Sequence, residues 1–178
     1  MTNLSVWPAE LPAGLRDLPA EVGGILGLEA TAVADPAAAA AAPDPLLVVV
    51  ADAAAAGVLA ALDAAAASRT APAVVVVSDG VIGTDGGDLA AALAGASAVT
   101  LVRSVAVRRS ATGRINAVAV PDRLFGAAGS QRGPLPLEIA SADVADVVAF
   151  LLSDESPYID GQVLYADGGR QLFSSLTA

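Results

Sequence analysis

The chain has 178 residues, which is long enough for one domain with a buried core. Hydrophobic residues make up 55% of it and aromatic residues only 3%, so we expect a core built from Ala, Val and Leu. The net charge of −10 argues against nucleic acid as the main ligand, and no apolar run is long enough to predict a membrane span.

The residue types that are missing restrict the chemistry. The chain has no cysteine, which excludes disulfides and thiolate metal sites, and no histidine, which removes the commonest general base and metal ligand. All nine basic residues are arginine, so no lysine can form a Schiff base. The first residues lack the pattern of a secretory signal, and we expect a cytoplasmic protein without a metal site.

Residues 1–45 carry the weakest pattern. Pro8, Pro12 and Pro19 divide their first part into short pieces. The pattern predicts a short helix over residues 21–28 and a short strand over residues 31–34. The alanine-rich residues 36–45 are typical of a linker.

Gly23, Gly24 and Gly27 have the composition of a dinucleotide-binding loop. Such a loop needs a buried strand directly before it and a helix N-terminus after it, so that free N–H groups face the pyrophosphate. Residues 15–21 do not form a buried-strand pattern. We therefore interpret these glycines as part of a small packed helix or turn and predict no cofactor-binding residue.

Two apolar runs, residues 46–50 and 73–78, are typical of parallel strands covered on both faces. Residues 53–68 between them predict a helix. Its apolar stripe consists of Val58, Leu59 and Leu62.

A glycine-rich loop and a long alanine-rich helix over residues 88–109 follow the second strand. Asp88 can cap this helix. Asp79, Asp85 and Asp88 could hold a hard cation, but their spacing matches no known loop, so capping and solvation remain the alternative. Arg108 and Arg109 could bind the phosphates of a carrier such as coenzyme A, or their positive charges could interact favourably with the dipole at the helix C-terminus.

The last third of the chain predicts a strand over residues 114–120 and a loop over residues 122–139. A helix over residues 142–153 follows, with Ser141 as its N-cap. A final strand over residues 162–166 leads into Asp-Gly-Gly at 167–169. The apolar stripe of the helix consists of Val144, Val147, Val148 and Leu151.

Three motifs carry a family resemblance. A strand ends at Ser78, residues 101–106 read Leu-Val-Arg-Ser-Val-Ala, and residues 151–169 run from a helix end through Ile-Asp-Gly to Asp-Gly-Gly. Together they resemble the short-chain dehydrogenase/reductases, most closely the 3-oxoacyl-carrier-protein reductase type. The resemblance covers about residues 46–173 and implies an α/β fold, a reduced Rossmann-like doubly wound parallel sheet that is truncated relative to the family.

The resemblance also shows what has been replaced. In the family the catalytic tyrosine follows the strand-end serine by thirteen residues and the lysine follows four later, which places Ala91 and Gly95 at these positions. Ser78 is then vestigial, and we expect it to bond the following loop. The only tyrosines, Tyr158 and Tyr165, lie where the family's equivalents are structural. We predict no catalytic residue.

Further departures concern the loops around the site. The strand over residues 46–50 is followed by Ala51 and Asp52, where the family has Asn-Asn-Ala-Gly, and the excursion that supplies the family's catalytic asparagine is missing. Val120 and Pro121 replace the family's Pro-Gly, so this loop should differ in geometry.

We expect one compact domain, in which residues 1–45 are a degenerate N-terminal part without the dinucleotide loop and residues 46–178 are dehydrogenase/reductase-like. Family members associate through two helices, here residues 53–68 and 88–109, whose small residues allow close approach of backbones. A second family interface corresponds to residues 142–169. Both interfaces look intact while the ligand-handling regions are degraded.

The resemblance therefore implies a pseudoenzyme: a non-catalytic subunit of a heterotetramer with a full-length catalytic relative. That partner would carry NAD or NADP, with none in this chain, and would oxidise or reduce a 3-hydroxyacyl or 3-oxoacyl thioester in acyl-CoA metabolism. No nucleic acid or membrane is expected as a partner. Two alternatives stay open: an NAD(P)-dependent oxidoreductase with an altered site, and a standalone ligand-binding module that uses the carboxyl ends of the strands.

Overall fold

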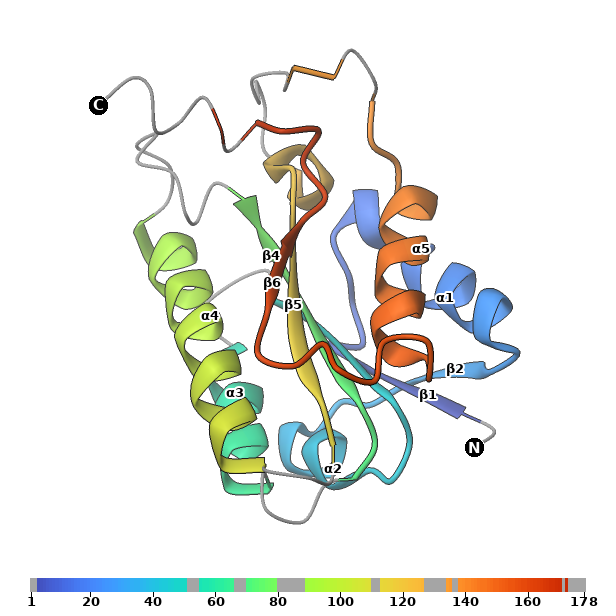
Figure 1. Cartoon of the computed structure of the whole chain (residues 1–178), viewed down its shortest axis with the longest axis vertical. Coiled ribbons are helices and arrows are strands. Elements are labelled where there is room, and N and C mark those ends of the chain that lie inside the picture. The colour runs from blue at the N-terminus through green and yellow to red at the C-terminus, as the bar shows by residue number, and fades with distance from the viewer. Residues whose placement is uncertain are drawn as a thin grey trace.

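The computed structural model describes residues 3–50, 55–65, 70–79, 89–109, 113–126, 134–135, 138–170 and 172. Six strands form one sheet in the order β2-β1-β3-β4-β5-β6, and every neighbouring pair is parallel (Figure 1). The strands are β1 (Asn3–Trp7), β2 (Glu29–Ala32), β3 (Leu46–Val50), β4 (Ala73–Ser78), β5 (Ile115–Val120) and β6 (Val163–Tyr165).

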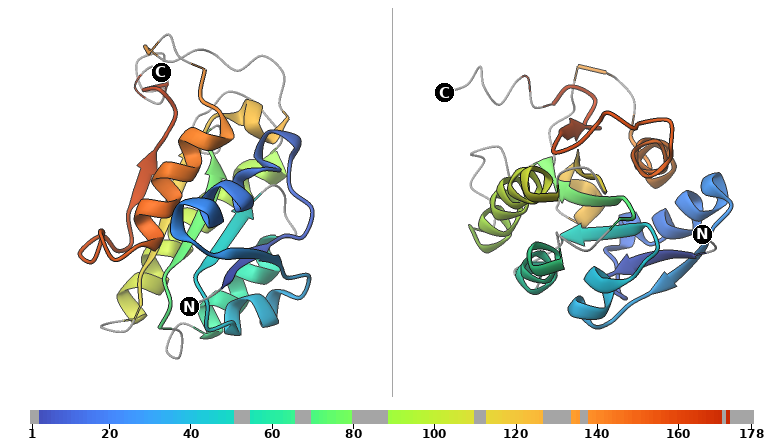
Figure 2. Two further views of the ribbon diagram at one scale, coloured as in Figure 1. Left: turned by 90° about the vertical axis from the view of Figure 1, so that its right-hand side faces the viewer. Right: turned by 60° about the horizontal axis from the view of Figure 1, so that its bottom comes forward.

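Helices cover both faces of the sheet, as the two further views show (Figure 2). One face carries α2 (Pro36–Ala41), α3 (Ala55–Ala65) and α4 (Leu89–Arg109), and the other carries α1 (Leu18–Leu26) and α5 (Ser141–Leu152). Two 3₁₀ helices, η1 (Ala13–Leu15) and η3 (Asp122–Phe125), lie on the α1–α5 face. The predicted doubly wound parallel α/β sheet is confirmed.

The central strands are hydrophobic on both faces because helices cover both sides. All five residues of β3 and all six of β5 are buried. Alternate residues point to opposite cores, so Val75 packs against the α2–α4 side and Val76 against the α1–α5 side. The predicted strands over residues 46–50 and 73–78 are confirmed with the same bounds.

The N-terminal part is more regular than its sequence pattern predicts. β1, which we did not predict, pairs with both β2 and β3 and therefore lies inside the sheet. The predicted linker over residues 36–45 is wrong at its start, because α2 begins there. The Asp35 side chain accepts a hydrogen bond from the Ala38 N–H (2.9 Å) and caps this helix.

The helices after β3 and β4 lie where the sequence predicts them. Leu62 of α3 is buried, as expected for its stripe, while the side chains of Val58 and Leu59 lie outside the described residues. The proposed cap Asp88 also lies outside them. Within the described part of the chain, no helix combines the length and the apolar character that crossing a membrane requires.

A buried polar side chain, Asn116, and a partly buried one, Arg114, hold the C-terminal segment in place. Asn116 of β5 donates to the Ile159 carbonyl (2.9 Å) and accepts from the Gln162 N–H (3.0 Å). Arg114 donates to the carbonyls of Leu151 (2.8 Å) and Ser153 (2.7 Å) at the end of α5. The last strand is thus positioned by bonds to β5 and by a capped helix.

The predicted N-cap of α5 is wrong. Ser141 is the first residue of the helix, and Ala140 occupies the cap position. The Asp143 carboxylate accepts from the Ala140 N–H (2.7 Å), while the Ser141 hydroxyl donates to Glu21 of α1. The apolar stripe of α5 is confirmed, with Val144, Val148 and Leu151 fully buried.

Candidate functional site

Ser78 ends β4 and lies beside the end of β5, because the two strands are parallel and Ser78 pairs with Val120. Its hydroxyl donates to a carboxylate oxygen of Asp122, two residues beyond β5. This described partner comes from the neighbouring strand end, and residues 80–88 of the loop to which we expected Ser78 to bond lie outside the described residues.

Asp79 follows Ser78 and is buried. Its Oδ1 accepts from a guanidinium nitrogen of Arg170 (2.9 Å) and from the Asp122 N–H (3.3 Å). The other Arg170 nitrogen lies 3.4 Å from the second oxygen of Asp122. We call Ser78, Asp79, Asp122 and Arg170 the strand-end cluster.

Burial is the main cause that raises the pKa of Asp79, to about 7. Arg170 lowers this pKa, while the nearby carboxylates of Asp122 and Asp167 raise it. The Oδ2 atom of Asp79 is buried and has no hydrogen-bond partner among the described residues. One arginine therefore faces more acidic charge than it neutralises, in a place where ionised carboxylates are poorly solvated.

The described hydrogen bonds of the strand-end cluster run mainly between its own members, although the Asp79 Oδ2 atom has no described partner. The Ser78 hydroxyl donates to one carboxylate oxygen of Asp122, and the other oxygen of this carboxylate faces Arg170. The links join β4, the segment after β5 and the Asp-Gly-Gly turn after β6. This arrangement fixes the C-terminal segment over the strand ends.

The positions that the resemblance assigns to the family's tyrosine and lysine fall on α4. Ala91 and Gly95 belong to this helix, whose backbone is described there, and neither residue type has a group that transfers a proton. Tyr158 is 98% exposed in the turn before β6. Tyr165 packs against the core on the α2–α4 side.

A dinucleotide would be held between β1 and α1, and the residues present there do not fit one. Gly14 lies in this connection, but a Cβ on it would come within 2.7 Å of the Leu124 carbonyl oxygen, so η3 already fills the space beside it. Pro19 removes one N–H from the first turn of α1. Glu21 adds a carboxylate to the same turn, which repels a pyrophosphate.

The three glycines of residues 22–28 lie elsewhere. Gly23 and Gly24 are inside α1, and Gly27 caps its C-terminus with a φ of 67°. Gly23 is closely packed, because a Cβ there would lie 2.6 Å from the Leu28 carbonyl oxygen. The interpretation as glycines of a packed helix and turn is confirmed.

No group of three or more carboxylates, histidines or cysteines within the described ranges is placed to hold a metal ion. The proposed cation ligands Asp85 and Asp88 lie outside these ranges. Asp79, the third of them, is engaged by Arg170.

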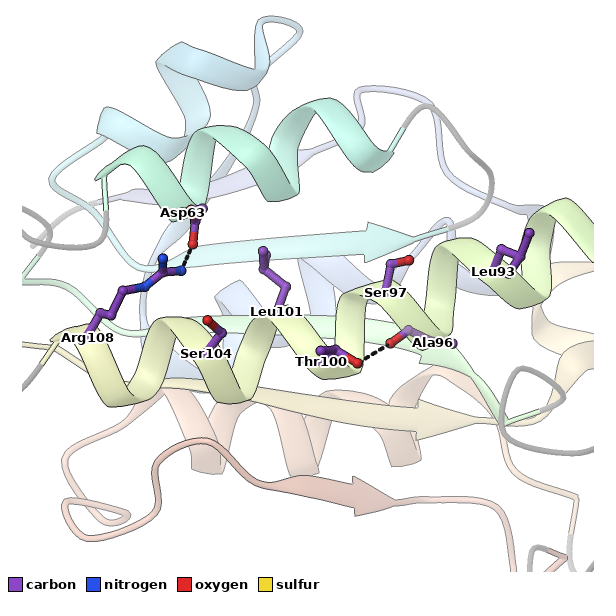
Figure 3. A pocket seen from close by; sticks show the side chains of 8 residues that line it. All are labelled: Asp63, Leu93, Ala96, Ser97, Thr100, Leu101, Ser104 and Arg108. Carbon is purple, nitrogen blue, oxygen red and sulfur yellow. Dashed lines mark hydrogen bonds and ion pairs between the residues drawn. The ribbon is translucent and has the colours of Figure 1, made fainter.

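A groove of about 520 Å³ lies on the outer side of α3 and α4 (Figure 3). Arg108 forms an ion pair with Asp63 of α3 at one end, and Leu93 stands at the other. Arg108 is therefore paired with a neighbouring helix, and the side chain of Arg109 lies outside the described residues. The groove is lined by Asp63, Leu93, Ala96, Ser97, Thr100, Leu101, Ser104 and Arg108.

Asp122 and Arg170 were missed by the sequence interpretation. The available signal was positional: polar residues that directly follow neighbouring parallel strands meet at one edge of the sheet. Asp79 and Asp122 both follow such strands, which would have placed them together. Arg170 follows a two-glycine turn, and no pattern in the sequence fixes the direction of its side chain.

The comparisons with known proteins agree on one family. The family model described as Enoyl-(Acyl carrier protein) reductase matches residues 30–171. Glucose 1-dehydrogenase of Gluconobacter oxydans (strain 621H) is 34% identical, over 41% of this chain and 32% of that protein. The matched stretch thus spans about a third of that curated relative.

Solved structures share the fold at low identity. The 3-alpha-hydroxysteroid dehydrogenase of Pseudomonas sp. B-0831, solved with NADH, has a TM-score of 0.68 at 19% identity over 100% of both chains. The enoyl-[acyl-carrier-protein] reductase (NADH) of Aquifex aeolicus VF5 has a TM-score of 0.71 at 13% identity, over 96% of this chain and 97% of that chain. A short-chain type dehydrogenase/reductase from Mycobacterium ulcerans has a TM-score of 0.70 at 16% identity, over 98% and 93%. With its family model, motifs and fold in agreement, this chain belongs to the short-chain dehydrogenase/reductase family of oxidoreductases.

Proposed function

We propose that this chain is a non-catalytic subunit of a heteromeric short-chain dehydrogenase/reductase. It pairs with a full-length catalytic relative and holds that partner's active-site helix and C-terminal segment in place. The partner carries the NAD or NADP and performs the hydride transfer.

The observation that carries this proposal is the identity of two residues on α4. The family's reaction needs a tyrosine that moves the hydroxyl proton and a lysine that lowers the tyrosine's pKa. Ala91 and Gly95 stand at these positions, and the chain has no lysine at all to substitute. The described acceptor of the Ser78 hydroxyl is Asp122, which is also bound by Arg170, and Ser78 without the tyrosine and lysine does not supply the family's proton transfer.

Two features of the geometry support the proposal. The strand-end cluster places Arg170 against Asp79 and Asp122 beside Ser78, so its hydrogen-bonding groups are turned toward one another. The connection between β1 and α1 offers a carboxylate and a proline where a dinucleotide needs free N–H groups.

Apolar exposure on the elements expected to associate also supports it. Leu93 and Val107 of α4 are 58% and 81% exposed, and Phe150 of α5 is 38% exposed. Each is a single exposed apolar side chain on an element that the proposal assigns to the partner interface, where a partner would cover it.

The partner's substrate is a thioester of a 3-hydroxy or 3-oxo acid in this proposal. The resemblance to the 3-oxoacyl-carrier-protein reductase type and the family model named for an acyl-carrier-protein reductase both favour a thioester of a 3-hydroxy or 3-oxo acid. Acyl-CoA metabolism is the corresponding context, with the cytoplasm as its location.

Co-expression tests the proposal. The chain is produced with the full-length family member encoded nearest to it, and the purified material is examined by native mass spectrometry and by acyl thioester turnover. We expect a mixed assembly, a heterotetramer in the simplest case, with higher activity or thermal stability than the relative alone. Two separate species would contradict the proposal.

An NAD(P)-dependent oxidoreductase with an altered site is the second candidate. The observation that favours it is Asp79, a carboxyl that titrates near neutral pH close to Ser78. Titration of the purified chain with NADH and NADPH, followed by fluorescence, separates the two. Tight binding to the isolated chain would favour the altered enzyme. A stable isolated monomer that binds neither the dinucleotides nor the relative would favour a ligand-binding module.

A further inference from the structure

The turn after β6 makes a charged contact with the ends of two other strands. Gly168 and Gly169 both have a positive φ, 67° and 82°, so the chain reverses within two residues and Arg170 lies back over β4 and β5 (Figure 1). One guanidinium nitrogen of Arg170 lies 2.9 Å from Asp79, and the other lies 3.4 Å from Asp122. The turn therefore lies over the carboxyl ends of the strands, the edge at which parallel α/β sheets bind ligands.

The charges beneath this turn do not balance when every carboxyl is ionised. The described charged groups that act on the Asp79 carboxyl are Asp122 of η3 and, in the turn after β6, Asp167 and Arg170. The single guanidinium faces more than one carboxylate, so ionisation of Asp79 adds a buried negative charge that the arginine does not neutralise. A proton on Asp79 removes this charge without breaking a contact.

The geometry of Asp79 indicates where that proton is held. Its Oδ1 atom accepts from Arg170 (2.9 Å) and from the Asp122 N–H (3.3 Å), and a neutral carboxyl can keep both bonds. Its Oδ2 atom is buried and has no hydrogen-bond partner among the described residues, which is an unfavourable place for negative charge. Burial raises the pKa of Asp79 to about 7, in agreement with a proton on Oδ2 below neutral pH.

We propose that the strand-end cluster is a proton-dependent latch for the turn after β6. While Asp79 holds its proton, the cluster stays closed and the turn covers the ends of β4 and β5. Once the proton has left, the carboxylate is more stable in water than in the cluster, so the turn opens more often and the strand ends become accessible. Gly168 and Gly169 allow this rearrangement, because glycine adopts many backbone conformations. The inference concerns this chain alone and goes beyond the proposed function.

Rising pH should open the latch. In the open form the hydrated Asp79 has its ordinary pKa of 3.8, whereas burial raises its pKa to about 7 in the closed form. Between these values opening releases a proton, so the ratio of open to closed chains should rise by up to about tenfold per pH unit. Above about pH 7 the carboxyl is ionised in both forms, and the ratio should level off.

Hydrogen–deuterium exchange of the full chain tests the latch. The amides of Ala166 and Gly169 donate hydrogen bonds at the start of the turn and within it, so their protection reports the closed form. After correction for the intrinsic exchange rate at each pH, protection over residues 164–170 should fall by up to about tenfold per unit from about pH 5 to about pH 7 and then level off. Residues 46–50 of β3 are the reference and should stay far better protected throughout.

Two variants separate the latch from a general effect of pH. Asp79→Asn has no proton to release, so its protection over residues 164–170 should stay constant with pH, while Asp146→Asn, exposed on α5, should follow the wild type. Arg170→Gln removes the charged contact and should lower this protection about tenfold or more at pH 6. Arg103→Gln, exposed on α4, should leave it unchanged.

The exchange profiles decide for or against the latch. A wild-type chain whose turn is equally protected at every pH would overturn the inference, and so would an Asp79→Asn variant that loses protection as the wild type does. Parallel losses over residues 46–50 and 164–170 would also overturn it, because exchange would then reflect unfolding of the whole chain. If Asp79→Asn does not fold, the wild-type profile and the comparison of Arg170→Gln with Arg103→Gln still decide.

Discussion

Burial governs the behaviour of Asp79 more strongly than its arginine partner does. Its side chain is 3% exposed, and the contact with Arg170 at 2.9 Å does not offset the loss of hydration. Because the carboxyl keeps its proton up to about pH 7 in the folded chain and only to about 3.8 in a solvated one, folding is coupled to pH.

The sign of this coupling gives the first prediction. Asp79 stabilises the fold fully below about pH 3.8, and this contribution is lost as the pH rises through about 7. Between these values its share of the unfolding free energy should fall by at most about 1.4 kcal/mol per pH unit. Urea denaturation from about pH 5 to about pH 8 should show a steeper loss for the wild type than for Asp79→Asn. Asp146→Asn, an exposed carboxyl of α5, should follow the wild type; equal slopes for all three would contradict the assignment.

At the scale of the elements, the connection between β1 and α1 is closed by direct contact between η1 and η3. Gly14 is the position at which this contact leaves no room for a side chain. We predict that Gly14→Ala destabilises the chain by about 1–3 kcal/mol, because the added methyl meets backbone rather than a mobile side chain. Gly24→Ala is the matched control: nothing lies within 4 Å of its Cβ, and in a helix it should stabilise by about 0.5–1 kcal/mol. Thermal denaturation compares the two, and an unchanged Gly14→Ala variant would mean that η3 does not pack there.

Arg114 is the residue at which we predict a loss of stability among the C-terminal elements. Its guanidinium bonds the last carbonyls of α5 and the Ser156 hydroxyl. Arg114→Ala should lower the unfolding free energy by about 1–3 kcal/mol, since these partly buried acceptors lose a charged donor. Arg103→Ala, on the exposed side of α4, should change it by less than about 0.5 kcal/mol. Comparable losses in both variants would contradict the role given to Arg114.

The sequence predicts the elements that repeat a simple pattern. Leu46–Val50 and Ala73–Ser78 are short apolar runs, rich in valine and flanked by turn residues, and this length and composition favour strands. β1 was not predicted, because its five residues include the polar Asn3 and Ser5 and a strand this short shows too little periodicity. α2 was not predicted, because its alanines form no apolar stripe and only the capping residue Asp35 indicates a helix.

The residues of the candidate site also differ in how far the sequence predicts them. The assignment of Ser78, Ala91 and Gly95 follows from the resemblance to the family, whose motif has a fixed spacing along the chain. The contacts of Asp79 with Asp122 and Arg170 join residues 43 or more positions apart, so they depend on how parallel strand ends meet. Ser141 shows that capping residues cannot always be predicted from residue type. It is a favourable N-cap residue, but it is the first residue of α5 and its hydroxyl donates to Glu21 of α1.

At the scale of the whole molecule, the fold is that of a short-chain dehydrogenase/reductase, and the resemblance places Ala91 and Gly95 where the family has its tyrosine and lysine. The proposal of a supporting subunit explains both facts together with the open apolar side chains on α4 and α5. It places the assembly's chemistry in another polypeptide, so the mass of the complex and the location of the cofactor are its strongest tests.

The most direct measurement is native mass spectrometry of the chain co-expressed with the full-length family member encoded nearest to it, in the presence of NADH or NADPH. The account predicts an assembly that contains both polypeptides, with bound dinucleotide equal in number to the copies of the full-length partner. Two polypeptides that never associate, or a dinucleotide retained by this chain alone, would contradict it.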